Sequence, residues 1–321
     1  MKAVDRSKFD RLVTIGGSEI GAVLGLSRWA SPLDVWNRKM RKTGETEATE
    51  PMRWGTLLED TVAREWASRT GKHAWKCNKT FLHDTLPLSA NVDRLVCPDT
   101  GKRPRPYAAG KFFPGTELLE VKTSRSDHGW GDDGSEVIPM VYAAQGQQYL
   151  GIPGLDVCNV AVLIGGSTLK TYRIARDDRV INRMFELAGQ WWQTHVATGN
   201  PPAPRTAAEV EQLFPGSEPR EVIAPAEVVV RVTRMATIKS EIKDRKTEFE
   251  LLKTSVCETM KDADTLVLPD GQPIVTWKLA KPAAVLDRKK LEERLGDLTP
   301  YTREAKSCRK FNIKGGTEDD E

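Results

Sequence analysis

The chain has 321 residues, of which 39% are hydrophobic and 29% charged, so it is long enough and apolar enough to bury a full core as a globular protein. No uninterrupted apolar stretch of membrane length occurs, and no apolar segment of the signal-peptide kind follows the N-terminus, which argues against membrane insertion and export. The net charge of +3 permits a local basic groove for nucleic acid without requiring one.

The five cysteines are scattered along the chain, at Cys77, Cys97, Cys158, Cys257 and Cys308. They are odd in number and never form a Cys-x-x-Cys pair, which disfavours a disulfide framework and also a zinc or iron–sulfur site. We therefore expect a reduced, cytoplasmic protein.

Two short helices are expected near the N-terminus. The pair Gly16-Gly17 gives the backbone freedom to turn sharply before a helix through Leu24, and Ser18 would cap or enter that helix. The Ser31-Pro32 pair supplies an N-cap and a proline at the first helical position, which predicts a second helix to about Lys42.

Strands and helices intermix over the following residues. Helices are expected over 54–69, 138–150 and 178–198 and strands within 72–96, 117–123, 157–164 and 170–174, with a loop over 102–115 and a hairpin turn at Gly165-Gly166. This pattern indicates an α/β (α+β) domain in which helices flank a mixed central sheet.

The proline-dense stretch 199–204 is the clearest domain boundary, because neither a helix nor a strand ladder continues through it. We expect a catalytic domain over 1–204, an appendage over 205–316, and a disordered acidic tail over 317–321.

The appendage has its own pattern. Apolar residues recur every seven positions along a charged helix, at Val228, Met235, Ile242, Phe249 and Val256. A second seam is mixed, since it contains Arg231 and Arg245, and this favours a packed amphipathic helix over a full coiled coil. The turn signal Pro269-Asp270-Gly271 between two apolar runs predicts a hairpin after the helix.

The most informative residues are Asp93 and the triplet Glu120-Val121-Lys122. Residues two apart on a strand share a face, so Glu120 and Lys122 would lie together, and a neighbouring strand or turn could bring Asp93 within reach. Two carboxylates form a hard oxygen site suited to Mg²⁺ or Mn²⁺, which could activate water against a phosphodiester while Lys122 orients that water or counters charge. The alternative without a catalytic role is that Glu120 and Lys122 form a solvated charge pair on an amphipathic strand.

Five ordered motifs make residues 1–204 resemble the phage exonuclease family of lambda exonuclease and the YqaJ-like viral recombinases, a branch of the PD-(D/E)xK nuclease superfamily. They are Arg11-Leu12-Val13-Thr14-Ile15-Gly16-Gly17-Ser18, Trp54-Gly55-Thr56-Leu57-Leu58-Glu59, Asp93, Glu120-Val121-Lys122 and Ala144-Gln145-Gly146-Gln147-Gln148-Tyr149. The resemblance implies a restriction-endonuclease-like core. The chain departs from the family in having Val92 where the superfamily expects proline, and the appendage has no counterpart in the compact lambda enzyme.

The resemblance also implies roles for the residues around the expected metal site. Asp93 and Glu120 match the metal-binding carboxylates, the carbonyl of Val121 resembles a further ligand, and Lys122 matches the catalytic lysine. Glu59 is similar to an additional acidic residue that lines the metal site, although an exposed helix charge is its alternative reading.

Two further groups of residues match the family's DNA contacts. Arg11, Ser18 and Arg28 fall where the family holds the terminal 5′-phosphate, against the alternative of a capping serine and two solvated arginines. Gln145 and Gln147 match the glutamine motif near the active centre, against the alternative of an ordinary polar helix face, and which of the two matters stays open.

The function that the resemblance implies is a Mg²⁺-dependent exonuclease, with Mn²⁺ as a possible substitute, that degrades linear double-stranded DNA from 5′ to 3′. Its product would be a 3′ overhang for phage recombination in the bacterial cytoplasm. The family further implies a homo-oligomer, as a trimeric ring, and a single-strand annealing protein as partner. The alternatives are a metal-dependent endonuclease, a non-catalytic DNA-binding module and, least expected, a structural phage protein.

Overall fold

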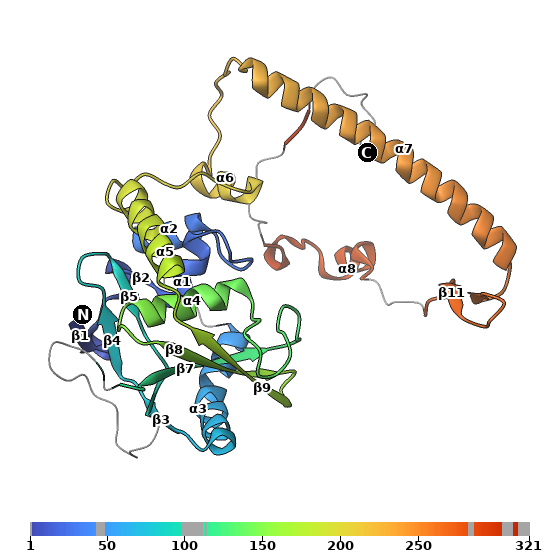
Figure 1. Cartoon of the computed structure of the whole chain (residues 1–321). Helices are drawn as coiled ribbons and strands as arrows, with labels where there is room; N and C mark the ends of the chain where they lie inside the picture. The colour runs from blue at the N-terminus through green and yellow to red at the C-terminus, as the bar shows by residue number, and fades with distance from the viewer. Residues whose placement is uncertain are drawn as a thin grey trace. The chain divides into compact units, whose positions relative to one another are not determined.

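The computed structural model describes residues 2–42, 49–97, 112, 114–281, 286–303 and 311–313. It divides into two compact units, residues 1–210 and 211–321 (Figure 1). Most of the loop expected over 102–115, the acidic tail and Cys308 lie outside the described residues.

A five-stranded mixed sheet forms the centre of the first unit. Its strands lie in the order β3 (His73–Lys76), β6 (Arg94–Cys97), β7 (Glu117–Ser124), β8 (Val157–Ile164) and β9 (Thr168–Ala175). The pair β7–β8 is parallel and the other pairs are antiparallel. The β8–β9 hairpin turns at Gly165 and Gly166, both with positive φ, as their sequence predicts. The predicted α/β class with a mixed sheet is confirmed.

Helices cover the two faces of this sheet (Figure 1). On one face, α3 (Glu50–Thr70) packs Val62 and Trp66 against Leu119 and Val121 of β7. On the other face, α4 (Met140–Gly151) and α5 (Asp178–Trp191) contribute to a larger core that includes Leu118. This division follows from the alternation of side chains along β7.

A second sheet adjoins these helices and joins strands that are far apart in the sequence. Its order is β1 (Lys2–Asp5), β4 (Lys79–Leu82), β5 (Leu88–Ala90) and β2 (Ile15–Gly16). The strands expected within 72–96 are therefore shared between two sheets. The sequence pattern does not reveal this, because short apolar runs do not specify their partners.

The N-terminal helices are α1 (Gly17–Val23) and α2 (Pro32–Lys39), with 3₁₀ turns at η1 (Arg6–Lys8) and η2 (Arg11–Val13). Ser31 caps α2 as predicted, since its hydroxyl accepts a hydrogen bond from the Asp34 N–H at 3.2 Å. The chain passes from β2 directly into α1 at Gly16 and Gly17, and neither glycine has a positive φ, so this change of direction does not require a conformation that is special to glycine. Gly17 instead permits close packing, because a Cβ there would lie 2.2 Å from the Tyr149 ring.

Two helix boundaries differ from those predicted. Helix α3 begins earlier, at Glu50, and the helix expected over 178–198 is α5 followed by a π-helical turn at η4 (Trp192–Val196). Helix α6 (Ala207–Leu213) lies where the chain divides into its two units.

The second unit contains the predicted helix and hairpin. Helix α7 (Ala226–Met260) is followed by the antiparallel strands β10 (Thr265–Val267) and β11 (Pro273–Thr276), by α8 (Arg288–Leu295) and by the turn η5 (Thr299–Tyr301). Within the described ranges, no helix has both the length and the apolar character needed to cross a membrane.

Candidate functional site

Strand β7 brings Glu120 and Lys122 to the face of the sheet that α4 covers. Val121 packs against α3 on the opposite face, so its neighbours on either side in the sequence must point toward α4. Both side chains are withdrawn from solvent, since Glu120 is 6% exposed and the Lys122 side chain is 18% exposed. The alternation that predicted this shared face is therefore borne out geometrically.

Asp93 reaches Glu120 through the pairing of β6 with β7. Because Arg94 at the start of β6 lies opposite Leu119, the residue before it falls beside the next part of β7. There an Asp93 carboxylate oxygen accepts a hydrogen bond from the Val121 N–H at 2.9 Å. The backbone carbonyl of Asp93 accepts a hydrogen bond from the Cys77 N–H at 3.1 Å, and this bond holds the backbone at Asp93 in place.

The Glu120 carboxylate is bound on one oxygen only. Its Oε1 lies 2.6 Å from Lys122 Nζ and accepts a hydrogen bond of the same length from Gln145 Nε2, which also contacts the Tyr149 hydroxyl at 3.1 Å. The other oxygen, Oε2, is buried and has no hydrogen-bond partner among the described residues. A buried carboxylate oxygen without a donor is costly, and a cation is a group that could satisfy it.

Burial and mutual repulsion raise the pKa values of both carboxyl groups. Loss of solvent, together with the charge of Asp93, raises the pKa of Glu120 to about 8. The pKa of Asp93 is raised by burial, although Lys122 and the Val121 N–H oppose that rise. Burial alone would lower the pKa of Lys122, but the two carboxylates keep it above its ordinary value. The site therefore holds a fixed positive charge beside two carboxyl groups that resist ionising together.

These residues suit a hard divalent cation. Asp93 and Glu120 offer carboxylate oxygens. Val121 directs its N–H to Asp93, and in an extended strand the carbonyl of the same residue points to the same side. No cluster of three acidic, histidine or cysteine side chains that could hold a metal is found in the described part of the chain. The candidate ligands are therefore two carboxylates and one carbonyl.

Glu59 approaches the same region from α3 but is bound elsewhere. Its Oε1 lies 2.6 Å from Arg94 Nη1, and Arg94 also contacts Asp60 at 3.0 Å. The charge of Glu59 contributes to the raised pKa of Asp93, so the two groups are near each other. As a metal ligand, Glu59 stays a prediction, because α3 covers the sheet face opposite to Glu120.

Two arginines that sequence reasoning missed hold the turn that carries Asp93. Arg6 donates from Nη2 to the Val92 carbonyl at 2.6 Å, and Arg94 donates from Nη1 to the Asp93 carbonyl at 2.9 Å. Arg94 could have been suspected from its position next to Asp93. Nothing in the sequence relates Arg6 to residues that are more than 80 positions away.

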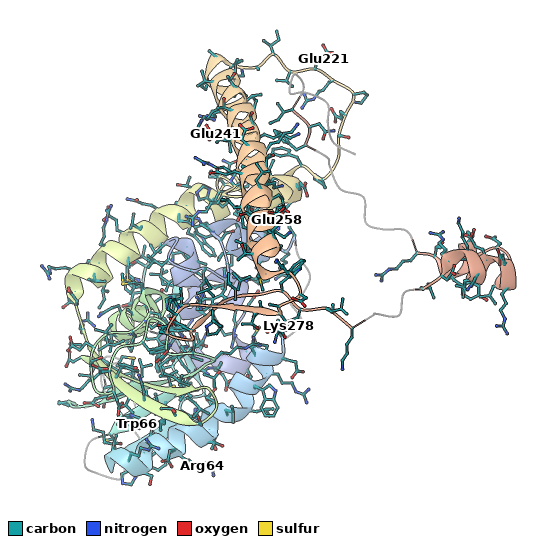
Figure 2. All side chains as sticks on the ribbon, turned by 90° about the vertical axis from the view of Figure 1, so that its right-hand side faces the viewer. Arg64, Trp66, Glu221, Glu241, Glu258 and Lys278 are labelled. Atoms are coloured by element: carbon teal, nitrogen blue, oxygen red, sulfur yellow. The ribbon has the colours of Figure 1, made fainter. Side chains whose placement is uncertain are left out.

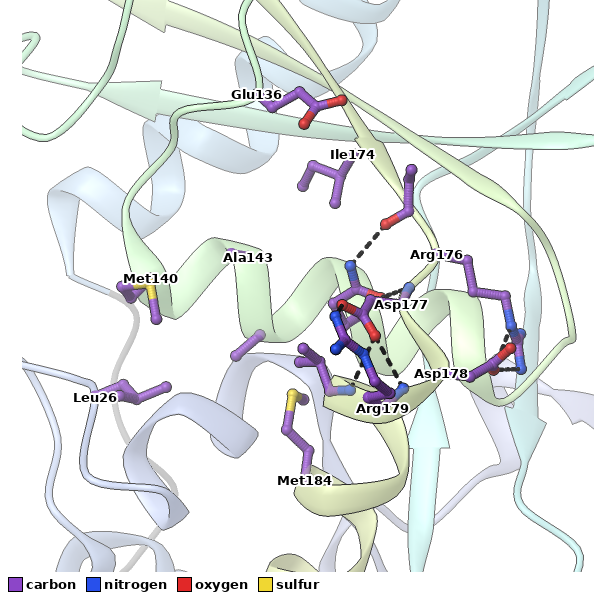
Figure 3. A pocket seen from close by; sticks show the side chains of 14 residues that line it. Leu26, Glu136, Met140, Ala143, Ile174, Arg176, Asp177, Asp178, Arg179 and Met184 are labelled. Atoms are coloured by element: carbon purple, nitrogen blue, oxygen red, sulfur yellow. Dashed lines mark hydrogen bonds and ion pairs between the residues drawn. The ribbon is translucent and has the colours of Figure 1, made fainter.

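The two motif glutamines have different environments. Gln145 binds Glu120, as described above. Gln147 donates to the Ala175 carbonyl at 2.8 Å and accepts from the Asp177 N–H at 3.0 Å, so it joins β9 to the start of α5. It lines a separate open cavity of about 730 Å³, which Figure 3 shows between Met140, Ile174 and Met184.

The residues expected to hold a 5′-phosphate lie on the surface of the first unit. Arg11, Ser18 and Arg28 are all exposed, and within the described residues none of their side chains bonds to Asp93, Glu120 or Lys122. Below them, the buried Lys39 ammonium donates to the Arg11 carbonyl at 2.8 Å and lies 2.6 Å from Glu19 Oε2. The backbone at Arg11 is therefore anchored, while its side chain projects into solvent.

A row of aromatic rings connects the Arg28 region to Lys122. The Arg28 guanidinium lies 4.7 Å from the Trp29 ring centroid, and Trp29 and Trp130 lie 6.1 and 5.4 Å from Tyr142. Lys122 Nζ lies 5.2 Å from the same Tyr142 ring. These rings line a cavity of about 210 Å³ together with Arg28 and Ser124.

Comparison with known proteins identifies a family that this chain resembles. Residues 8–156 match the sequence model of the YqaJ-like viral recombinase domain. Protein YqaJ of Bacillus subtilis (strain 168) is 29% identical over 324 aligned positions, which cover 97% of this chain and 94% of that protein.

The similar solved structures are more distant. An alkaline exonuclease from Laribacter hongkongensis has a TM-score of 0.43 and 18% identity over 59% of this chain and 90% of its own. A phage related exonuclease from Haemophilus somnus 129PT has a TM-score of 0.40 and 10% identity over 60% of this chain and 99% of its own.

Proposed function

Residues 8–156 match the YqaJ-like viral recombinase domain, and from that match we propose that the chain is a divalent-metal-dependent deoxyribonuclease acting on the ends of linear duplex DNA. The observation that carries the proposal is the grouping of Asp93, Glu120 and Lys122, in which a buried Glu120 oxygen lacks a partner among the described residues. Two carboxylates would hold the cation for metal-assisted phosphodiester hydrolysis, and the lysine beside them would stabilise developing negative charge.

Asp93, Glu120 and the Val121 carbonyl would hold the cation, which we take to be Mg²⁺ with Mn²⁺ as a substitute. When bound, the cation would supply activation of a water molecule and neutralisation of charge on the phosphate. Gln145 holds the Glu120 carboxylate in one orientation through its 2.6 Å hydrogen bond. The Lys122 ammonium would direct the attacking water or counter the charge that develops in the transition state.

The direction of digestion is the finer part of the proposal. The resemblance to lambda exonuclease supports hydrolysis from the 5′ end, which leaves a 3′ single-stranded overhang. Arg11, Ser18 and Arg28 would bind the terminal phosphate, and the exposed Arg11 and Arg28 guanidinium groups suit bidentate contacts with phosphate oxygens. Contacts of this kind carry no base information, so little sequence preference is expected.

The biological setting follows from the same resemblance. The overhang would serve a single-strand annealing protein during phage recombination in a bacterial cell. A ring-shaped homo-oligomer around the DNA, of three subunits as in the lambda exonuclease family, would keep the enzyme on its substrate.

The decisive experiment compares matched linear and covalently closed duplex DNA in Mg²⁺, with strand-specific labels and with 5′-phosphorylated or 5′-hydroxyl ends. We expect loss of the linear DNA only, from the 5′ strand. Cutting of the closed circle would instead identify an endonuclease. An absence of metal-dependent cleavage, with DNA binding retained, would identify a binding module.

The end-binding residues are tested by Arg11→Ala in the same assay, with Arg64→Ala on the exposed surface of α3 as the control. Loss of a phosphate contact should slow digestion of phosphorylated ends by roughly tenfold and leave hydroxyl ends nearly unchanged. Equal slowing on both kinds of end would remove Arg11 from the phosphate pocket.

A further inference from the structure

Helix α7, which Figure 2 shows with its side chains and with Glu241 and Glu258 labelled, carries an apolar seam that the described residues of its own unit leave largely exposed. The seam repeats every seven residues, and three of its members are exposed by 41 to 63%: Met235, Ile242 and Phe249. In this helix of 35 residues, Met260 at the C-terminal end is the buried residue. The sequence predicts a packed helix, but the packing partner is not found within the described part of this unit.

Such a helix gains little stability from its own backbone in water. Most helical stability in proteins comes from packing an amphipathic face, and an exposed apolar seam of this length marks an interaction surface. The period of seven is the pattern of helices that wrap around each other in a left-handed coiled coil. The seam therefore suits a single α-helix as its partner.

The charges beside the seam match a second copy of the same helix. In a parallel pair, a residue on one flank faces the residue five positions later in the partner. This rule sets Glu241 against Lys246 and Glu248 against Lys253, and each contact occurs twice by symmetry. The pair of Arg234 with Lys239 is like-charged. In an antiparallel pair the same flank would set these lysines against one another, so the sequence favours the parallel arrangement.

The two arginines of the second seam weaken the pairing of two helices but do not prevent it. Arg245 Nη1 lies 2.6 Å from Glu248 Oε2 on the same helix, which draws its guanidinium to the flank and leaves its methylene groups at the seam. Arg231 lies two heptads before Arg245 at the equivalent position. Ile238 and Leu252 alternate with these arginines and supply apolar layers of the second seam.

We propose that α7 is a self-association element that pairs in parallel and in register with α7 of a second copy of this chain. The pairing acts through the appendage, independently of Asp93, Glu120 and Lys122 in the first unit, and it is a contact additional to those of the proposed three-subunit ring. It does not rest on the proposed nuclease activity.

Cross-linking of the full-length chain tests the geometry. In a parallel pair the two copies of position 228 face each other, whereas an antiparallel pair separates them by about 46 Å along the helix axis. Val228→Cys should give a covalent dimer under mild oxidation faster than Val230→Cys, which lies off the seam, and faster than the unmodified chain with its own cysteines. Equal rates for the three proteins would overturn the proposal.

Charge reversal tests the pairing by a second route, read as the dissociation constant from sedimentation of full-length protein. Glu248→Lys should raise that constant on the order of tenfold, and Lys253→Glu added to it should restore the original value. Phe249→Lys in the seam should raise it by at least roughly 100-fold, while Leu251→Lys, exposed but off the seam, should not. Equal effects of Phe249→Lys and Leu251→Lys, or a double variant no tighter than Glu248→Lys, would refute pairing through this seam.

Discussion

Glu120→Gln is expected to change how the stability of the metal-free protein depends on pH. The carboxyl group has a pKa of about 8 in the folded chain and an ordinary value of 4.5 when unfolded. Between these values the folded state binds the extra proton. The free energy of unfolding should therefore fall as pH rises through this window, and the neutral amide of the variant should remove that fall.

The size of the effect follows from linkage. One proton bound only by the folded state changes the free energy of unfolding by about 1.4 kcal/mol per pH unit. Between about pH 5.5 and 7.5 the wild type should lose roughly 2 to 3 kcal/mol relative to Glu120→Gln. Lys122 does not contribute to this slope, because a lysine with a raised pKa stays charged in both states at these pH values.

Glu117 on the same strand offers a matched control. Burial would raise its pKa, but hydrogen bonds from Lys72 and Asn159 lower it below the ordinary value. Its contribution is present above about 4.5 and is lost only on acidification, so Glu117→Gln should keep the wild-type slope over this range.

The assay is urea unfolding in EDTA at several pH values, followed by the fluorescence of the buried Trp36 and Trp66 of the first unit. Mg²⁺ should stabilise the wild type more at high pH than at low pH, because a bound cation favours the ionised carboxylates, and it should stabilise Glu120→Gln much less. Parallel pH slopes for wild type and Glu120→Gln would refute the assignment of a buried, proton-binding Glu120.

Three further substitutions probe the site. Lys122→Ala should lower cleavage by at least roughly 100-fold while DNA binding, measured by fluorescence anisotropy, is largely kept, and a wild-type rate would contradict its role. Arg6→Ala removes the hydrogen bond to the Val92 carbonyl and should weaken Mn²⁺ binding, measured by calorimetry, roughly tenfold, whereas unchanged affinity would dissociate Arg6 from the Asp93 turn. Gly17→Ala forces a Cβ into the Tyr149 ring and should lower the free energy of unfolding by about 1 to 3 kcal/mol, which is measured as a lower melting temperature. The control is Gly216→Ala, because a Cβ at Gly216 meets nothing within 4 Å.

Local features of the fold were readable from the sequence because they depend on neighbouring residues. The Ser31 cap, the Gly165-Gly166 turn and the α7 helix are each specified by side chains within a few positions. The shared face of Glu120 and Lys122 belongs to the same class, since strand alternation alone dictates it.

Other features required the tertiary structure, because they join distant segments. Sequence could not separate Gln145, which binds Glu120, from Gln147, which fixes the start of α5, since both are polar residues of one helix. Only the fold brings Arg6 to the peptide before Asp93. It also shows that Gly17 is needed for its closeness to an aromatic ring rather than for a turn.

The sequence by itself thus determined the chemical groups of this protein and their local order: two carboxylates, a lysine, and a helix with a period of seven. The tertiary structure decided which groups meet and at what distance from solvent. Burial is the physical reason for the difference, because the pKa of Glu120, its unpartnered oxygen and the exposed seam of α7 are all properties of surroundings that no local pattern encodes.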